Sequence, residues 1–203
     1  MNIMAEENIK EQWKRFEENC RNCTACGLSA ARTNVVISRG GRSAPLMLIG
    51  EAPGRDEDIK GMPFVGKSGQ LLQNLLEFYN FSPKDYHICN IVKCRPPENR
   101  RPEASEIMAC KKLLAQQFSL VKPKVIVLLG STAYEAFYGV KPVMRDVRGV
   151  FTERKGYHIM TTFHPAFALR NDKMKIPIYE DIGKVRRKLE ELDILPGIDS
   201  DEN

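Results

Sequence analysis

Four cysteines fall into two pairs that lie far apart in the sequence. Cys23 and Cys26 form a C-x-x-C near the N-terminus, whereas Cys94 and Cys110 follow much later, with fifteen residues between them. Thiolates are the ligands of iron–sulfur clusters and of tetrahedral structural zinc, so four of them suggest a soft metal centre. Cys94 lies inside the segment Asn90–Asn99, which is typical of a functional loop.

Two further cysteines need another explanation. Cys20 completes a C-x-x-C-x-x-C run and could compete with Cys23, but we interpret it as a spectator thiol that ends a helix. Cys89 lies in an apolar run, where a free cysteine most often acts as a small buried hydrophobic residue.

Carboxylates gather after the apolar run Leu46–Gly50. The segment Gly50–Asp58 places two glycines around Pro53, a tight turn whose backbone can approach a ligand closely. Its acidic side chains are Glu51, Asp56, Glu57 and Asp58. Taken alone, this pattern is more typical of a solvated acidic turn, and Phe64 just beyond it of a core aromatic residue.

Two later segments carry groups suited to nucleic acid. Asn90 follows an apolar run, and its amide can donate to and accept from the edge of a heterocycle. A proline-stiffened basic stretch then suits phosphate contact, although each arginine alone is typical of an exposed turn; its arginines are Arg95, Arg100 and Arg101. His164 also follows an apolar run and can act as a donor near neutral pH.

Spacing of apolar residues predicts the elements that position these groups. Strands are expected at Leu46–Gly50, Tyr86–Val92 and Val125–Gly130, with a final β pair at Val150–Phe151 and His158–Phe163. Helices are expected near 9–19, 70–78, 102–120, 132–138 and 179–192. Alternating strands and helices predict an α/β sandwich with a mostly parallel sheet, whose sites lie at the carboxyl ends of strands. The polar segments should therefore meet at one edge.

Composition indicates an ordinary globular protein. The 203 residues carry a formal net charge of +5 and a pI near 8.9, which is compatible with a polyanionic partner but does not establish one. No apolar run approaches the roughly 20 residues of a transmembrane helix, and the N-terminus lacks a signal-peptide pattern. We expect a cytoplasmic protein of one domain over 1–203, with a helix and cysteine knuckle at about 1–30 and a frayed tail at about 196–203.

Together the motifs resemble the family 4 uracil-DNA glycosylases, the iron–sulfur group. The matching segments are Cys23–Cys26, Gly50–Gly54 with Glu57 and Asp58, Gly61–Gly66, Asn90–Arg100, Cys110, Leu129–Gly130, Arg148–Gly149 and His164–Ala166. They cover roughly residues 20–190 in order. The resemblance implies a three-layer α/β/α fold with a central four-stranded parallel sheet, and a structural 4Fe–4S cluster on Cys23, Cys26, Cys94 and Cys110.

The resemblance also implies hydrolysis of the N-glycosidic bond of deoxyuridine in DNA, the first step of base-excision repair. Phe64 would stack on the flipped uracil, Asn90 would read its edge, and His164 would donate to its O2. Ala52 and Gly54 would complete the uracil site. Ala52 stands where better-known relatives carry an aspartate, so Glu57 is expected to be the important acid, with Glu51 and Asn99 as helpers. Residues expected at the DNA are Arg95, Arg100, Phe167, Leu169 and Arg170; Phe167 and Leu169 could wedge into the base stack or simply start a helix.

Other functions remain open at the level of sequence. The chain could be a non-catalytic iron–sulfur module that binds nucleic acid, or an electron-transfer or zinc protein. We expect a monomer that acts on single- or double-stranded DNA. A sliding clamp is a candidate partner, although neither terminus carries a clear clamp-binding segment.

Overall fold

The computed structural model describes residues 3–197 and contains one mixed sheet of six strands, in the order β1-β3-β2-β4-β6-β5. The strands are β1 (Arg39–Gly40), β2 (Leu46–Gly50), β3 (Tyr86–Asn90), β4 (Val125–Leu129), β5 (Phe151–Arg154) and β6 (Tyr157–Thr162). The four central strands β3, β2, β4 and β6 run parallel, while β1 and β5 pair antiparallel at the two edges. The predicted parallel sheet is confirmed, β5 and β6 form the predicted final β pair, and the structure adds the edge strand β1.

The central strands are largely buried because both faces of the sheet are covered. All residues of β2, β3 and β4 are buried, and successive side chains alternate between two cores. In β2, Leu46 and Leu48 pack in one core, whereas Met47 and Ile49 pack in the other. This explains why these strands appear as continuous apolar runs in the sequence.

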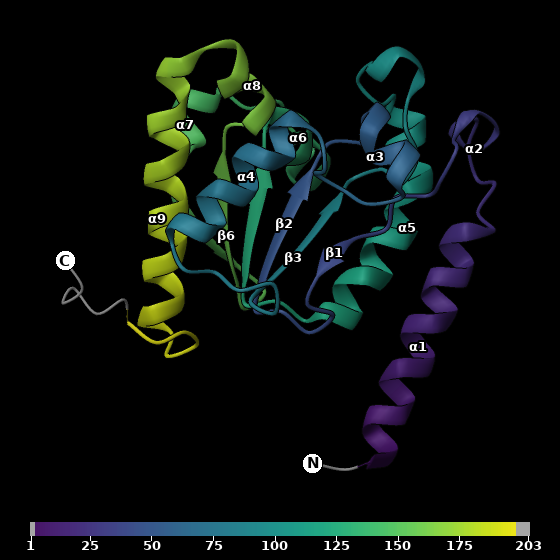
Figure 1. The fold of residues 1–203 in the computed structure, drawn as a ribbon, viewed down its shortest axis with the longest axis horizontal. Helices are drawn as coiled ribbons and strands as arrows, with labels where there is room; N and C mark the ends of the chain where they lie inside the picture. The colour runs from purple at the N-terminus through teal and green to yellow at the C-terminus, as the bar shows by residue number, and fades with distance from the viewer. Residues whose placement is uncertain (1–2, 198–203) are drawn as a thin grey trace.

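Helices cover each face. They are α1 (Ile3–Arg21), α2 (Leu28–Ala31), α3 (Arg55–Lys60), α4 (Lys67–Phe78), η1 (Pro97–Asn99), α5 (Ala104–Val121), α6 (Ser131–Tyr138), α7 (Met144–Val147), α8 (Pro165–Arg170), η2 (Asp172–Met174) and α9 (Lys175–Glu191). Helices α4 and α9 contribute to the first core, and α5 and α6 to the second. Figure 1 shows α4 in front of the strands and α1 and α9 at opposite sides of the molecule. Helix α1 packs on α5 through Trp13 and Phe16.

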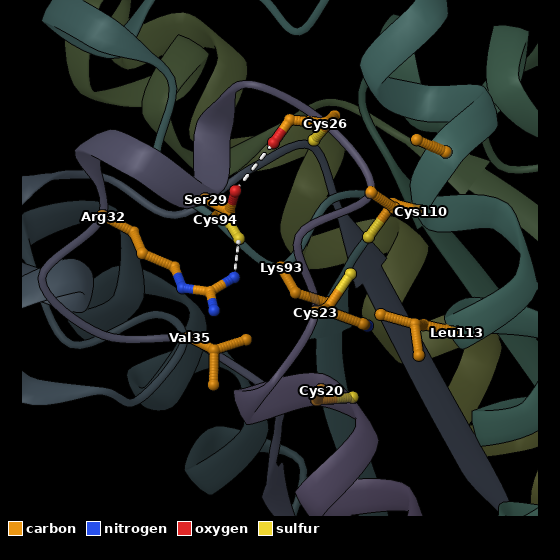
Figure 2. Close-up of a pocket in the computed structure, with 12 residues that line it drawn as sticks. Cys20, Cys23, Cys26, Ser29, Arg32, Val35, Lys93, Cys94, Cys110 and Leu113 are labelled. Atoms are coloured by element: carbon orange, nitrogen blue, oxygen red, sulfur yellow. Dashed lines mark hydrogen bonds between the residues drawn. The ribbon is translucent and has the colours of Figure 1, made fainter.

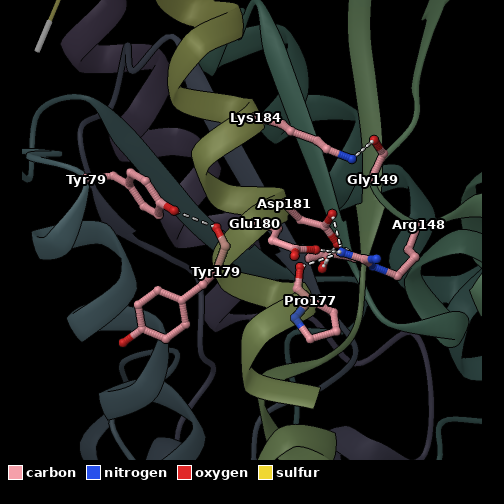
Figure 3. Close-up of polar contacts among 9 residues, drawn as sticks. Tyr79, Arg148, Gly149, Pro177, Tyr179, Glu180, Asp181 and Lys184 are labelled. Atoms are coloured by element: carbon pink, nitrogen blue, oxygen red, sulfur yellow. Dashed lines mark hydrogen bonds and ion pairs between the residues drawn. The ribbon is translucent and has the colours of Figure 1, made fainter. Parts of the chain in front are cut away.

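One buried ion pair fastens α9 to the sheet. Arg148 donates to both carboxylate oxygens of Asp181, at 2.9 and 2.7 Å, and Thr162 at the end of β6 donates to the same carboxylate. Figure 3 shows the Arg148–Asp181 pair, together with the bond from Lys184 to the carbonyl of Gly149. A Cβ at Gly149 would lie 2.4 Å from Asp181 Oδ1, so the Arg148–Gly149 motif has a structural role here.

No helix within 3–197 is both long enough and apolar enough to span a membrane. Division of the chain into a single domain stays a prediction. Residues 198–203 of the predicted frayed tail lie outside the described part of the chain.

Candidate active site and metal centre

The carboxyl ends of β2 and β3 bring two predicted site segments together. The N–H groups of Ile91 and Val92 donate to the carbonyls of Gly50 and Glu51, so parallel pairing continues past both strands. Asn90 is only 2% exposed, and its Oδ1 has no hydrogen-bond partner among the described residues. A buried amide oxygen without a partner is costly, so this atom is poised for a ligand.

The ring of Phe64 lies beside Asn90. A Cβ at Gly50 would come within 2.4 Å of Asn90 Oδ1 and 2.6 Å of Phe64 Cζ, so glycine is required for this approach. Phe64 has a φ of 55°, a left-handed conformation that is strained for an aromatic residue. Its ring stacks on His164, with centroids 5.6 Å apart and an interplanar angle of 27°. The three residues expected to hold uracil therefore come together.

Glu57 stabilises the turn that carries Phe64. Its Oε1 accepts hydrogen bonds from the backbone N–H groups of Val65 and Gly66, at 3.0 and 2.8 Å. Its Oε2 accepts from the N–H of Gly54, at 3.0 Å, which also caps α3. Both oxygens of the buried carboxylate are thus used by the protein's own backbone.

His164 is held as a neutral hydrogen-bond donor. Its Nδ1 accepts from the backbone N–H of Ala166 at 3.1 Å, so the ring proton is assigned to Nε2. Burial lowers the pKa of His164 to about 4, and the charge of Arg170 acts in the same direction. At neutral pH the imidazole therefore carries one proton, on the nitrogen that remains free to donate.

An open cavity lies at the ends of β2, β4 and β6. It is lined by Glu51, Ala52, Asn99, Leu129, Gly130, Ser131, Met144, Phe163, His164, Ala166, Phe167 and Arg170. Glu51 is half-buried there and accepts a hydrogen bond from the hydroxyl of Thr132. Glu51, Ala52, Asn99 and His164 thus share the cavity, whereas Glu57 does not line it.

The residues expected to touch DNA have different surroundings. Phe167 and Leu169 on α8 are 38% and 43% exposed beside the cavity, as a wedge into DNA would require. Arg95 donates to Asn99 Oδ1 at 2.7 Å, and Asn99 has a left-handed φ of 56°. Arg100 is bound in a bidentate pair to Glu106, so its guanidinium is already engaged.

The four predicted ligand thiols line a second cavity. Its walls are Cys20, Cys23, Ala25, Cys26, Ser29, Arg32, Val35, Lys93, Cys94, Ala109, Cys110 and Leu113. Figure 2 shows Cys23, Cys26, Cys94 and Cys110 around this space, with Cys20 below them on α1. Arg32 donates to Cys94 Sγ at 3.1 Å. An all-sulfur donor set with an N–H donor to sulfur fits an iron–sulfur cluster.

The arrangement and the protonation of the cysteine thiols both bear on how a metal would bind in this cavity. Within 3–197, no three His, Cys, Asp or Glu side chains are arranged to hold a metal ion. Burial raises the pKa of Cys110 to about 11 and raises that of Cys94, although Arg32 offsets the shift at Cys94. Ligation must therefore release protons from these thiols. Cys89 is fully buried outside the cavity lining, in agreement with its interpretation as an apolar residue.

A buried polar chain that the sequence did not indicate begins at the carbonyl of Asn90. The Lys93 ammonium donates to the carbonyl of Asn90, at 2.9 Å, and to Gln117 Oε1. Gln117 Nε2 in turn lies 2.9 Å from His87 Nε2. In the sequence, Lys93 could have been noticed as a lysine next to a cysteine in an otherwise apolar segment. No sequence feature pointed to Gln117 on α5.

Comparisons with known proteins agree with this geometry. Residues 37–183 match the model of the uracil DNA glycosylase superfamily, a range that begins after Cys23 and Cys26. The chain is 42% identical over 181 residues to the type-4 uracil-DNA glycosylase of Thermotoga maritima, covering 87% of this chain and 94% of that relative. It is 42% identical over 182 residues to the type-4 enzyme of Saccharolobus solfataricus, with 85% and 84% covered. A type-5 uracil-DNA glycosylase of Pyrobaculum aerophilum is 28% identical over 144 residues, with 63% of each chain covered.

Proposed function

Because this chain belongs to the uracil-DNA glycosylase superfamily, we propose that it removes uracil from DNA by hydrolysing the N-glycosidic bond. The reaction starts base-excision repair. The unpartnered Oδ1 of buried Asn90, beside the stacked rings of Phe64 and His164, is the observation that carries this proposal.

Recognition rests on the amide of Asn90. Its Oδ1 accepts from uracil N3–H while its Nδ2 donates to uracil O4. Cytosine presents the opposite pattern at these two positions, so it would leave buried polar groups unpaired. Flipping the nucleotide costs a few kcal/mol and is cheapest at a mismatch, which favours the G·U pair left by cytosine deamination. Phe64 offers an aromatic face for the flipped base.

Bond cleavage rests on His164 and a carboxylate. The Nε2–H of His164 donates to uracil O2 as negative charge develops on the departing base. Glu51 lines the cavity and is the acid that we assign to positioning the water that attacks the sugar. The three backbone bonds of Glu57 support a different role from the one expected: it positions the turn that carries Phe64.

We assign a 4Fe–4S cluster to Cys23, Cys26, Cys94 and Cys110, which surround one cavity. These cysteines come from the N-terminal knuckle, the Asn90–Asn99 loop and α5, so a bound cluster would cross-link the three segments. We propose that Phe167, Leu169 and Arg170 contact the DNA strand and that Arg95, through its hydrogen bond to Asn99, orders that residue. Cytoplasmic location, a monomeric state and a sliding-clamp partner stay predictions.

A uracil-release assay tests the proposal. The purified protein should release uracil from single-stranded DNA and from a G·U duplex, but no base from the same strands with thymine in place of uracil. Asn90→Ala should lower the rate by about 10²-fold or more, because it removes the base-reading amide. No uracil release from either substrate by the cluster-containing protein would contradict the proposed activity.

A further inference from the structure

Lys93 is a buried cation without an acidic partner. Its side chain is 1% exposed, and its ammonium donates to the Asn90 carbonyl and to the Gln117 side chain. No aspartate or glutamate between residues 7 and 197 forms an ion pair with it. An ammonium taken out of water is costly unless an anion faces it. The position of Lys93 therefore calls for a source of negative charge nearby.

The cysteine cavity provides such a source. Lys93 lines this cavity together with the four candidate ligands, and Figure 2 draws it among their side chains. Thiolates that bind iron bring negative charge to the centre of the cavity. Arg32, on another wall, donates to Cys94 Sγ. Lys93 and Arg32 are thus two cationic residues in the walls of one cysteine cavity.

The other end of the polar chain fixes Lys93 in place. His87 is 1% exposed, and burial lowers its pKa to about 4, so its ring is neutral. Its Nδ1–H donates to the Gly41 carbonyl at 2.8 Å, which leaves Nε2 to accept from the Gln117 amide. Gln117 must then turn its oxygen toward Lys93. The Lys93 ammonium is held by two acceptors, and the Gln117 amide is itself held by His87 and the carbonyl of Ile37, so the ammonium has little freedom to move.

We propose that Lys93 is a positioning residue that couples the metal centre to base recognition. Its charge balances the cluster thiolates, while its hydrogen bond to the Asn90 carbonyl holds the residue that reads uracil. This inference rests on the proposed function and on the proposed cluster. It gives the cluster a defined mechanical connection to the active site through one side chain.

Three variants separate charge from packing. Lys93→Met keeps most of the side-chain volume and removes the charge. Gln117→Met breaks the polar chain but keeps the charge of Lys93. Lys112→Met removes an exposed lysine of α5 as a matched control. For each, we would measure iron content, the rate of iron loss to a chelator, the reduction potential of the cluster, and kcat and KM for uracil release.

Lys93→Met should lose iron about 10- to 100-fold faster and shift the potential to more negative values, because a nearby positive charge has gone. Its kcat should fall about 10- to 100-fold with little change in KM, since the DNA-facing surface is intact. Gln117→Met should lower kcat without moving the potential. Lys112→Met should change none of these quantities. If Lys93→Met does not fold, Lys93→Gln should show the same shift in potential.

An unchanged reduction potential and an unchanged rate of iron loss in Lys93→Met would overturn the inference. Equal shifts in the reduction potential of Lys93→Met and Gln117→Met would also overturn it. Wild-type protein that binds no iron–sulfur cluster would overturn the proposed cofactor and the inference with it. Wild-type protein that holds the cluster but releases no uracil would overturn the proposed activity and the coupling to base recognition, whereas the charge balance between Lys93 and the cluster would still be tested by the potential.

Discussion

Phe64 and His164 form a preassembled pair at the active site, although one hundred positions separate them in the chain. Their rings stack with centroids 5.6 Å apart. Phe64 adopts a left-handed backbone conformation, which the protein maintains from two sides. Glu57 binds the N–H groups that follow Phe64, and Gly69 on α4 packs directly against its carbonyl. Strain of this kind persists only where the surrounding structure enforces it.

Gly69→Ala should separate this pair. A Cβ at Gly69 would lie 1.9 Å from the Phe64 carbonyl oxygen, so either α4 or the Phe64 turn must move. We expect uracil release under single-turnover conditions to slow by about 10²-fold. Gln70→Ala, at the exposed next position of α4, is the control and should retain the wild-type rate. A normal rate in Gly69→Ala would show that the stacked arrangement is not needed.

Replacement by glutamine should have different effects at Glu57 and at Glu51. Glu57→Gln places an NH2 group against backbone N–H donors, so the free energy of unfolding should fall by about 1.5–3 kcal/mol. Glu51→Gln keeps the cavity shape and should mainly lower kcat. Urea unfolding and uracil-release kinetics on both variants make the comparison. A Glu57→Gln protein of normal stability but without activity would instead make Glu57 the water-activating acid.

The pH dependence of catalysis should show that His164 works as a neutral donor. Its pKa is lowered to about 4, so the imidazole stays neutral as the pH falls through its ordinary value near 6.5. The rate of the chemical step should therefore show no inflection from His164 between about pH 8 and pH 5. His164→Ala should lower kcat by about 10²- to 10³-fold. An inflection near pH 6.5 that disappears in His164→Ala would contradict the neutral-donor assignment.

Arg148 should be a stability residue with no direct part in chemistry. Asp181 is fully buried, and Arg148→Met would leave its carboxylate without the bidentate partner. We expect the free energy of unfolding to fall by about 3–5 kcal/mol. Arg145→Met is the matched control, because Arg145 is 87% exposed and pairs with a neighbouring surface aspartate. Chemical denaturation of both variants measures the difference.

Local pattern in the sequence was enough to predict the centre of the fold. The strands β2, β3 and β4 are buried at every position and mostly apolar, with His87 as a polar exception inside β3, because both faces of the sheet are covered. Edge strand β1 has two residues, Arg39 and Gly40, and leaves no periodic signal. The predicted final β pair is confirmed as the antiparallel hairpin of β5 and β6.

The sequence alone also determined which residue types were available for chemistry, namely four paired cysteines, Asn90 and His164. Only the tertiary structure decided how other polar residues act. Glu57 turns to the backbone of Val65 and Gly66, and Lys93 reaches Gln117 on α5, because folding brings these groups within hydrogen-bond distance. A residue's type and spacing fix the chemistry it can perform. Which partner it meets depends on long-range packing, which local pattern does not encode.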